Sequence, residues 1–191
     1  IDGTPVSDAG LLALLPPIVE RAMHIGASYF EVATALALQC FSDAQMDVEI
    51  LEAGVGARLD ATTAVPADMA LLTPVALDHQ AWLGDTLADI AFEKAHVFAG
   101  CRLCLSAVQS DAVRQVVDGI APGVRYISQA ADMVLSMQGA HQQDNAALVL
   151  SAINTLQSAG LVDKGEQTID AIRQAIAKVQ VPGRLQQVQL G

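Results

Sequence analysis

Three residues combine chemically useful side chains with positions at which proteins often bind ligands: Glu52, His79 and Lys94. Glu52 follows the run 47–51, which is predicted to be a short strand, and comes shortly before Gly54, where the backbone can approach a ligand closely. In open α/β sheets, ligands bind beyond the carboxyl ends of the strands. A carboxylate at such a strand end can hold a metal ion, although a surface carboxylate beside a turn would have the same sequence surroundings.

His79 comes after a second run, the apolar residues 69–72, which is also predicted to be a strand. A short segment that contains Thr73-Pro74 separates His79 from this run. A histidine in this place can bind a metal through one ring nitrogen while a neighbouring group orients the other. A single histidine is also a common loop residue. If the two runs are neighbouring parallel strands, Glu52 and His79 come together at the same edge of the sheet.

Lys94 lies on a predicted helix whose apolar residues recur at the spacing i, i+3, i+4, i+7. The lysine falls within this stripe, so we expect it on the buried face. Partial desolvation favours a neutral amine, which can act as a nucleophile or take up carbon dioxide as a carbamate. The alternative is that the aliphatic stem packs while the ammonium group reaches water or pairs with a carboxylate.

The elements that must position these residues are predicted from hydrophobic periodicity and from Pro and Gly punctuation. Helices are expected at 8–23, with an interruption at Pro16-Pro17, and at 29–41, 84–98, 111–120, 145–158 and 166–179. Strands are expected at 47–51, 69–72, 101–108 and 124–127. The alternation of strands with helices predicts one α/β domain over residues 1–191, with a mainly parallel sheet flanked by helices.

Composition limits the kind of partner. The 191 residues are 52% hydrophobic and 16% charged, which excludes a disordered chain. The net charge of −11 argues against binding to nucleic acid or to an anionic membrane. No apolar run is long enough to cross a membrane. Three cysteines, an odd number, suit a reducing compartment, and we expect a cytoplasmic monomer.

Several segments, in this order along the chain, resemble successive motifs of the folylpolyglutamate synthase/dihydrofolate synthase family. These Mur-ligase-like, ATP-dependent amide-bond ligases act in folate biosynthesis and one-carbon metabolism. The segments are 28–31, 52–62, 76–79, 82–84, 92–95, 139–147 and 181–185. The resemblance implies the Mur-ligase-like α/β fold and a reaction in which ATP phosphorylates a substrate carboxylate. The amine of L-glutamate then attacks the acyl phosphate.

The resemblance also implies roles for individual residues. Glu52 and His79 match Mg²⁺ ligands, and Lys94 matches a catalytic lysine whose carbamate helps to hold Mg²⁺. Asn145 and Arg184 match contacts to ATP, which is a co-substrate. The residues that match the lining of the pterin or folate site are Ser28, Tyr29, Phe30, Glu31, Leu59, Asp60 and Ala61. The implied partners are dihydropteroate or folate, L-glutamate and ATP.

The resemblance covers the central portion of the family's length. The chain contains no Gly-rich phosphate loop ending in Gly-Lys-Ser/Thr, and the family's C-terminal domain would follow Arg184. We therefore expect the 191 residues alone to be an incomplete, inactive portion of a ligase. Two alternatives are a cell-wall ligase that acts on muramyl peptides and a non-catalytic domain that binds a ligand or a partner.

Overall fold

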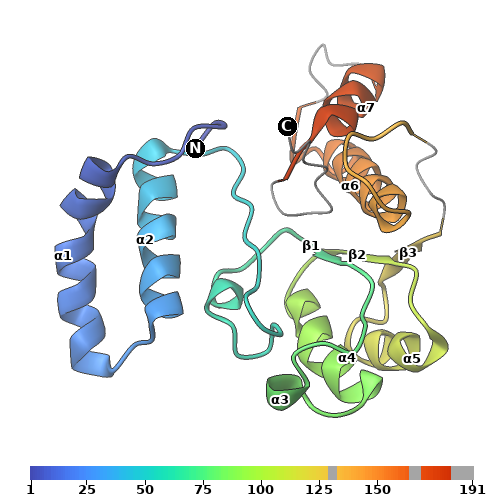
Figure 1. Ribbon diagram of the computed structural model, residues 1–191, viewed down its shortest axis with the longest axis horizontal. Helices are drawn as coiled ribbons and strands as arrows, with labels where there is room; N and C mark the ends of the chain where they lie inside the picture. The colour runs from blue at the N-terminus through green and yellow to red at the C-terminus, as the bar shows by residue number, and fades with distance from the viewer. Residues whose placement is uncertain (129–132, 164–168, 182–191) are drawn as a thin grey trace, which may run out of the picture. The chain divides into compact units, whose positions relative to one another are not determined.

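The computed structural model describes residues 1–128, 133–163 and 169–181. The chain divides into two compact units, Ile1–Val65 and Pro66–Gly191 (Figure 1). The expectation of a single domain over residues 1–191 stays a prediction.

The first unit is built on two helices, α1 (Asp8–Ile25) and α2 (Tyr29–Ala44), which pack against each other. Ser7 caps the start of α1 by accepting a hydrogen bond from Gly10 N. Gly26, with a φ of 68°, ends it in the left-handed conformation that glycine adopts without strain. The predicted interruption at Pro16-Pro17 is wrong, since α1 runs continuously through both prolines.

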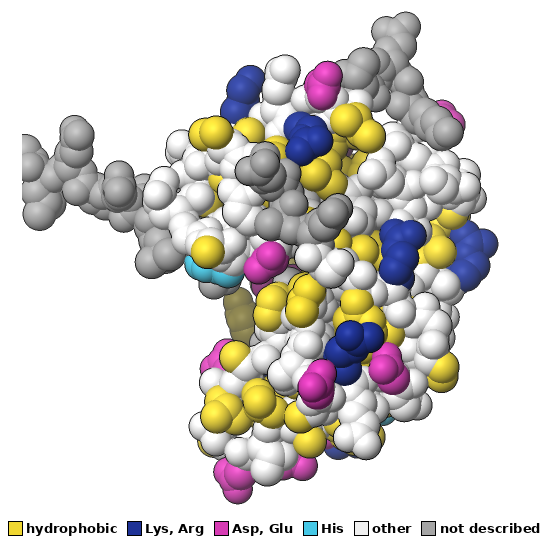
Figure 2. Space-filling view, turned by 90° about the vertical axis from the view of Figure 1, so that its right-hand side faces the viewer, with side chains coloured by type: hydrophobic (Ala, Val, Ile, Leu, Met, Phe, Trp, Pro, Cys, Tyr) yellow, Lys and Arg dark blue, Asp and Glu magenta, His cyan; other side chains and the backbone are white. Residues whose placement is uncertain are grey.

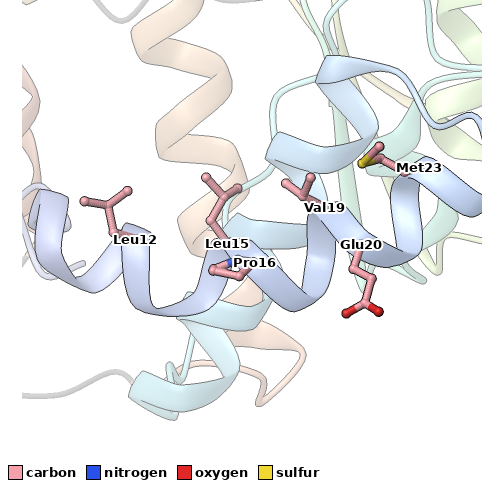
Figure 3. Close-up of a pocket in the computed structure, with 6 residues that line it drawn as sticks. All are labelled: Leu12, Leu15, Pro16, Val19, Glu20 and Met23. Atoms are coloured by element: carbon pink, nitrogen blue, oxygen red, sulfur yellow. The ribbon is translucent and has the colours of Figure 1, made fainter.

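One side of α1 is apolar and largely open. Figure 3 shows a shallow hollow whose lining comes from this helix alone: Leu12, Leu15, Pro16, Val19, Glu20 and Met23. Leu12 is 66% exposed and Met23 78% exposed. The sequence of α2 is apolar nearly all round, yet Thr34 and Cys40 are its only buried residues and Tyr29 is 86% exposed. Apolar composition alone therefore misjudges how much of the helix pair is covered.

The segment 47–51 was expected to be a strand, and this expectation is wrong. Asp47 lies in a bend, and none of the residues 47–51 belongs to a strand. A short apolar run becomes a strand only when its backbone groups pair with a neighbour. Among the described residues, the sheet consists of β1 (Met69–Leu72), β2 (Leu103–Ala107) and β3 (Arg125–Ile127), so 47–51 has no strand partner.

The sheet of the second unit is parallel, in the order β1-β2-β3. Leu72 is paired with Ser106, and Ser106 in turn with Tyr126. The predicted parallel sheet flanked by helices is thus confirmed. β1 has the predicted bounds, whereas β2 and β3 are shorter than the predicted strands 101–108 and 124–127.

Helices cover both faces of this sheet, as Figure 1 shows. On one face, α4 (Leu87–Ala95) and α5 (Asp111–Ile120) pack against each other and against Ala70 and Leu72. On the other face, α6 (His141–Ser158) covers Leu105 and Ala107. In β1, the buried Ala70 and Leu72 alternate with less buried neighbours, because successive side chains point to opposite faces of the sheet. In β2, the consecutive residues Leu105, Ser106 and Ala107 are all buried, because helices cover both faces of this central strand.

Four further helical elements complete the described part of the chain. They are the 3₁₀ helices η1 (Ala61–Ala64) and η2 (His96–Phe98), the single-turn helix α3 (Gln80–Leu83) and the helix α7 (Ile169–Lys178). The helix predicted over 84–98 begins at Leu87 instead, because Thr86 and Asp89 form a capping box there. Within the described part of the chain, none of the helices combines the length and apolarity of a membrane span.

Candidate functional site

His79 lies in the second unit, at the N-terminal end of α3, with a φ of 52°. A left-handed histidine is uncommon and carries a conformational cost of order 1 kcal/mol. Asp78 holds it from two sides: Asp78 Oδ1 accepts a hydrogen bond from His79 N at 2.8 Å, and Asp78 Oδ2 lies 3.4 Å from His79 Nε2. The imidazole is accessible, since 43% of the side chain is exposed. His79 therefore does not lie directly at the end of β1 but is separated from the strand by a loop.

Lys94 lies in the last turn of α4, also in the second unit. It is half-buried, between the fully buried Ala91 and Ala95. The helix places Ile90 and Phe98 in the core, so Lys94 stands at the border of the buried face rather than at its centre. A lysine at such a border packs its aliphatic stem against the core while its amine stays accessible to solvent. Both a carbamate and an ammonium group in contact with water are compatible with this position.

Glu52 lies in the first unit, in an exposed loop. The expectation that Glu52 and His79 end neighbouring strands is wrong, because no strand precedes Glu52. Nor do the described residues contain a cluster of three or more His, Cys, Asp or Glu side chains placed to hold a metal ion. The three-residue site of Glu52, His79 and Lys94 spans both units and stays a prediction.

The segment 28–31 divides into a structural pair and an exposed pair. Ser28 N donates to Glu31 Oε2 at 2.7 Å, and Glu31 N donates to Ser28 Oγ at 3.3 Å, which together form the capping box of α2. The side-chain and backbone hydrogen bonds from Ser28 lower the pKa of Glu31. Tyr29 and Phe30, in contrast, direct exposed aromatic surface outward. Of the predicted pterin-lining residues here, the two aromatic ones are free to contact a ligand.

A second predicted substrate segment meets Phe30 within the same unit. A Cβ added to Gly54 would lie 3.1 Å from the tip of the Phe30 ring and 3.4 Å from Asp60 Oδ2. Asp60 closes this loop and caps η1 through Thr62 N. Leu59, beside it, is 83% exposed, and Ala61 is half-buried. The first unit thus joins the two predicted substrate segments at the contact of Phe30 with Gly54.

The predicted nucleotide contact Asn145 lies in the first turns of α6 and is half-buried. Its Nδ2 donates to Gln142 Oε1 at 3.2 Å, and Gln142 Nε2 lies 3.1 Å from His141 Nε2. Gln142, which is 6% exposed, therefore fixes the orientation of the Asn145 amide. Arg184, the other predicted ATP contact, lies outside the described residues.

The sequence did not single out Gln142 or Gln109 as functional residues. Both are buried polar side chains. Gln142 accepts a hydrogen bond from Asn145, a predicted site residue, and Gln109 accepts one from Val75, in the loop that leads to His79. A single glutamine near a strand end or a helix start adds nothing to the hydrophobic pattern of the sequence. The contacts of Gln109 and Gln142 are therefore visible only in the folded chain.

The surface contains no obvious basic platform on the face drawn in Figure 2. Lys and Arg side chains lie there in several separate places, among hydrophobic and acidic side chains. This distribution agrees with the acidic composition of the chain.

The second unit has a parallel sheet with helices on both faces, and polar side chains lie in the loops beyond the carboxyl ends of its strands. These features define an α/β protein of the class that binds its ligands at the carboxyl edge of the sheet.

No family model matches the chain. Individual proteins match it over nearly its whole length. Dihydrofolate synthase/folylpolyglutamate synthase of Mycobacterium tuberculosis is 30% identical over 235 residues, which cover 98% of this chain and 48% of that protein.

The protein of the same description from Escherichia coli is 33% identical over 206 residues, covering 97% of this chain and 47% of that protein. The solved structure of E. coli FolC in complex with DHPP and ADP matches 98% of this chain and 48% of that one, with a TM-score of 0.79 and 29% identity. The chain belongs to the folylpolyglutamate synthase/dihydrofolate synthase family. It spans about half the length of the curated relatives it matches.

Proposed function

We propose that this chain is part of an ATP-dependent ligase that adds L-glutamate to dihydropteroate, to folate or to both. The observation that carries the proposal is the similarity over 98% of the chain to a dihydrofolate synthase/folylpolyglutamate synthase. The related E. coli structure holding DHPP and ADP supports a pterin-type acceptor and an adenine nucleotide as the two ligands. The proposed compartment is the cytoplasm, and the proposed state is a monomer.

The pterin or folate site that we propose lies in the first unit, around Tyr29, Phe30 and Leu59. Their exposed apolar surfaces can stack on a flat ring. Ser28, Glu31 and Asp60 are already engaged in hydrogen bonds that fix the backbone beneath these side chains. Ala61 would line the site from η1. The polar residues thus serve mainly to hold the aromatic surface in place.

The proposed metal site uses Glu52, His79 and carbamylated Lys94. Its donor set fits Mg²⁺, which favours carboxylate oxygen together with water and phosphate ligands. Glu52 and His79 have exposed side chains, and the Lys94 amine stands at the edge of its helix face. When bound, Mg²⁺ would neutralise charge on the transferring phosphoryl group. Asn145 and Arg184 would orient the nucleotide.

In the proposed reaction, a carboxylate oxygen of the acceptor attacks the γ-phosphorus of ATP and ADP leaves. The nitrogen of glutamate then attacks the acyl carbon, inorganic phosphate leaves, and the amine loses a proton as the amide bond forms. Most of the catalytic task is to position the reactants and to stabilise charge. That task suits residues held by loops on a rigid sheet, such as His79.

The test is glutamate-dependent release of ADP by the full-length protein, with dihydropteroate, a reduced folate or a muramyl peptide as the acceptor. ADP release with either pterin-containing acceptor, together with the glutamylated product, supports the proposal. Turnover with only the muramyl peptide would instead identify a cell-wall ligase. Tight binding of dihydropteroate without turnover would identify a non-catalytic binding protein, and both of these results contradict the proposal.

A further inference from the structure

Gln109 is a buried residue in the loop between β2 and α5, and its side chain bonds to the loop that follows β1. Its side chain is 8% exposed. Oε1 accepts a hydrogen bond from Val75 N at 2.9 Å, while Nε2 donates to Thr73 O and to Ser106 Oγ, both at 3.0 Å. Both hydrogens on Nε2 and one acceptor site on Oε1 are used, so the amide can take only this orientation.

These bonds continue the sheet. In a parallel ladder, a residue engages the carbonyl and the N–H that flank its partner on the next strand. Thr73 O and Val75 N flank Pro74 in just this way. The regular pairing ends where Leu72 lies opposite Ser106. The side-chain amide of Gln109 therefore replaces a backbone amide and extends the pairing of this chain segment past β1, as far as Val75.

Ser106 holds Gln109 from the centre of the sheet. Its side chain is 0% exposed, and its hydroxyl accepts from Gln109 while donating to Ala107 O at 2.8 Å. An apolar side chain at position 109 would leave Thr73 O, Val75 N and the Ser106 hydroxyl without this partner. Unmade hydrogen bonds at partly buried groups are costly, so the amide is strongly specified here.

The segment held in this way leads to His79. Val75 is half-buried, whereas residues 76–78 are exposed. On the far side of His79 the chain is anchored again, by the buried Leu83 and by Gly84, where a Cβ would lie only 2.5 Å from Asp89 Cβ. We propose that Gln109 is a positioning residue: its amide fixes where the His79 loop leaves the sheet and so sets the place and the left-handed backbone of His79. This inference rests on the proposed function, in which His79 is a Mg²⁺ ligand.

The experiment compares Gln109→Met with Gln115→Met in the 191-residue chain by NMR. Gln115 lies exposed on α5 and serves as the matched control. In Gln109→Met, we expect the Val75 amide to exchange with solvent roughly tenfold faster or more, as for the loss of one net hydrogen bond. We also expect the His79 Cα and Hα shifts to lose their left-handed values. Exchange at Val113 and Val117 should not change, because the core is intact.

An unchanged His79 conformation in folded Gln109→Met would overturn the inference. If that variant does not fold, the same signals in Gln109→Glu decide the question. Glu keeps an acceptor for Val75 N but provides no donor for Thr73 O. Line broadening of the His79 ring by Mn²⁺, used in place of Mg²⁺, should occur in the native chain and weaken in Gln109→Met but not in Gln115→Met. No broadening in the native chain would refute the metal role alone, separately from the positioning result.

Discussion

Asp60 closes the turn at Gly54, whose backbone N–H donates to Asp60 Oδ2 at 2.8 Å. The other carboxylate oxygen, Oδ1, accepts from Thr62 N at 2.9 Å and from Thr62 Oγ1 at 2.6 Å. One side chain therefore ties the start of the loop to the start of η1. This arrangement holds the backbone of Gly54 against the tip of the Phe30 ring, and it gives Asp60 a structural task inside the proposed substrate site.

Asp60→Ala should destabilise the first unit by about 1–3 kcal/mol, because it removes a helix cap and the bond to Gly54 together. Urea denaturation measures the loss, and amide exchange at Gly54 and Thr62 locates it. Asp47→Ala, in the exposed preceding segment, is the control. Equal stability of the two variants would show that the carboxylate does not hold the loop.

Gly54→Ala should act through Phe30. The new Cβ would lie 3.1 Å from the ring, so the ring must shift by a few tenths of an ångström or the loop must move. We expect a cost of about 1 kcal/mol, within the range for overpacking. In a Phe30→Ala background the cost should largely disappear, and a double-mutant cycle measured by urea denaturation would show it. Additive effects would mean that the two residues do not interact.

The capping box of α2 should make stability depend on pH through Glu31. Hydrogen bonds from Ser28 lower the pKa of Glu31 below its usual value of 4.5. The folded state thus favours the carboxylate, so the stabilisation is present above the unfolded pKa and is lost as pH falls through the lower folded value. NMR titration of the Glu31 carboxyl carbon measures this pKa. Ser28→Ala should return it toward 4.5, and an unchanged titration would contradict the assignment.

Tyr126 on β3 should titrate unusually late. Burial, followed by the hydrogen bond to Asp118 Oδ1 at 2.9 Å and the Asp118 charge, raises its pKa to about 12, although Arg114 above the ring opposes the shift. The resulting stabilisation is complete below a pH of about 10, the usual tyrosine value, and is lost as pH rises through about 12.

Phenolate absorbance in a Tyr29→Phe background isolates the titration of Tyr126. Asp118→Ala should lower the pKa of Tyr126, and Arg114→Ala should raise it. Two shifts of the same sign would contradict the described pairing.

The sequence was a good guide where local signals and tertiary packing agree. The α5 bounds were predicted exactly, because Val113 and Val117 lie on one stripe that packs into the core. The start of α2 at Tyr29 was also predicted, and there the Ser28 hydroxyl and the Glu31 carboxylate form a local capping box. Helix stripes and helix caps depend on residues only a few positions apart, so they can be predicted from the sequence alone.

The sequence misled where an element needs a distant partner. The run 47–51 was predicted to be a strand but has no strand beside it, and Pro16-Pro17 lie in a helix that continues through them. The site shows the same division. The exposed aromatic residues of the segment 28–31 could be proposed from the family motif, whereas the contact of Phe30 with Gly54 and the bonds of Gln109 join segments far apart in the chain.

Lys94 distinguishes most sharply between a packing role and a chemical one. A carbamate forms when the neutral amine nitrogen attacks carbon dioxide and releases a proton, so its occupancy should increase with pH and with bicarbonate. In the native chain supplied with ¹³C-bicarbonate, NMR should show a carbamate carbon that is absent in Lys94→Ala.

In the full-length protein, Lys94→Ala should lose about 10²–10³ in ligase rate, as for one lost charge-stabilising group. Bicarbonate should not restore this activity, because the variant has no amine to modify. Acetate, a small carboxylate, should rescue it in part. Lys94→Arg is the control for the packed stem: it keeps a long cationic side chain but cannot form this carbamate, so it should be as inactive as Lys94→Ala. Full activity of either variant would reduce Lys94 to a lysine whose stem packs and whose ammonium group reaches water.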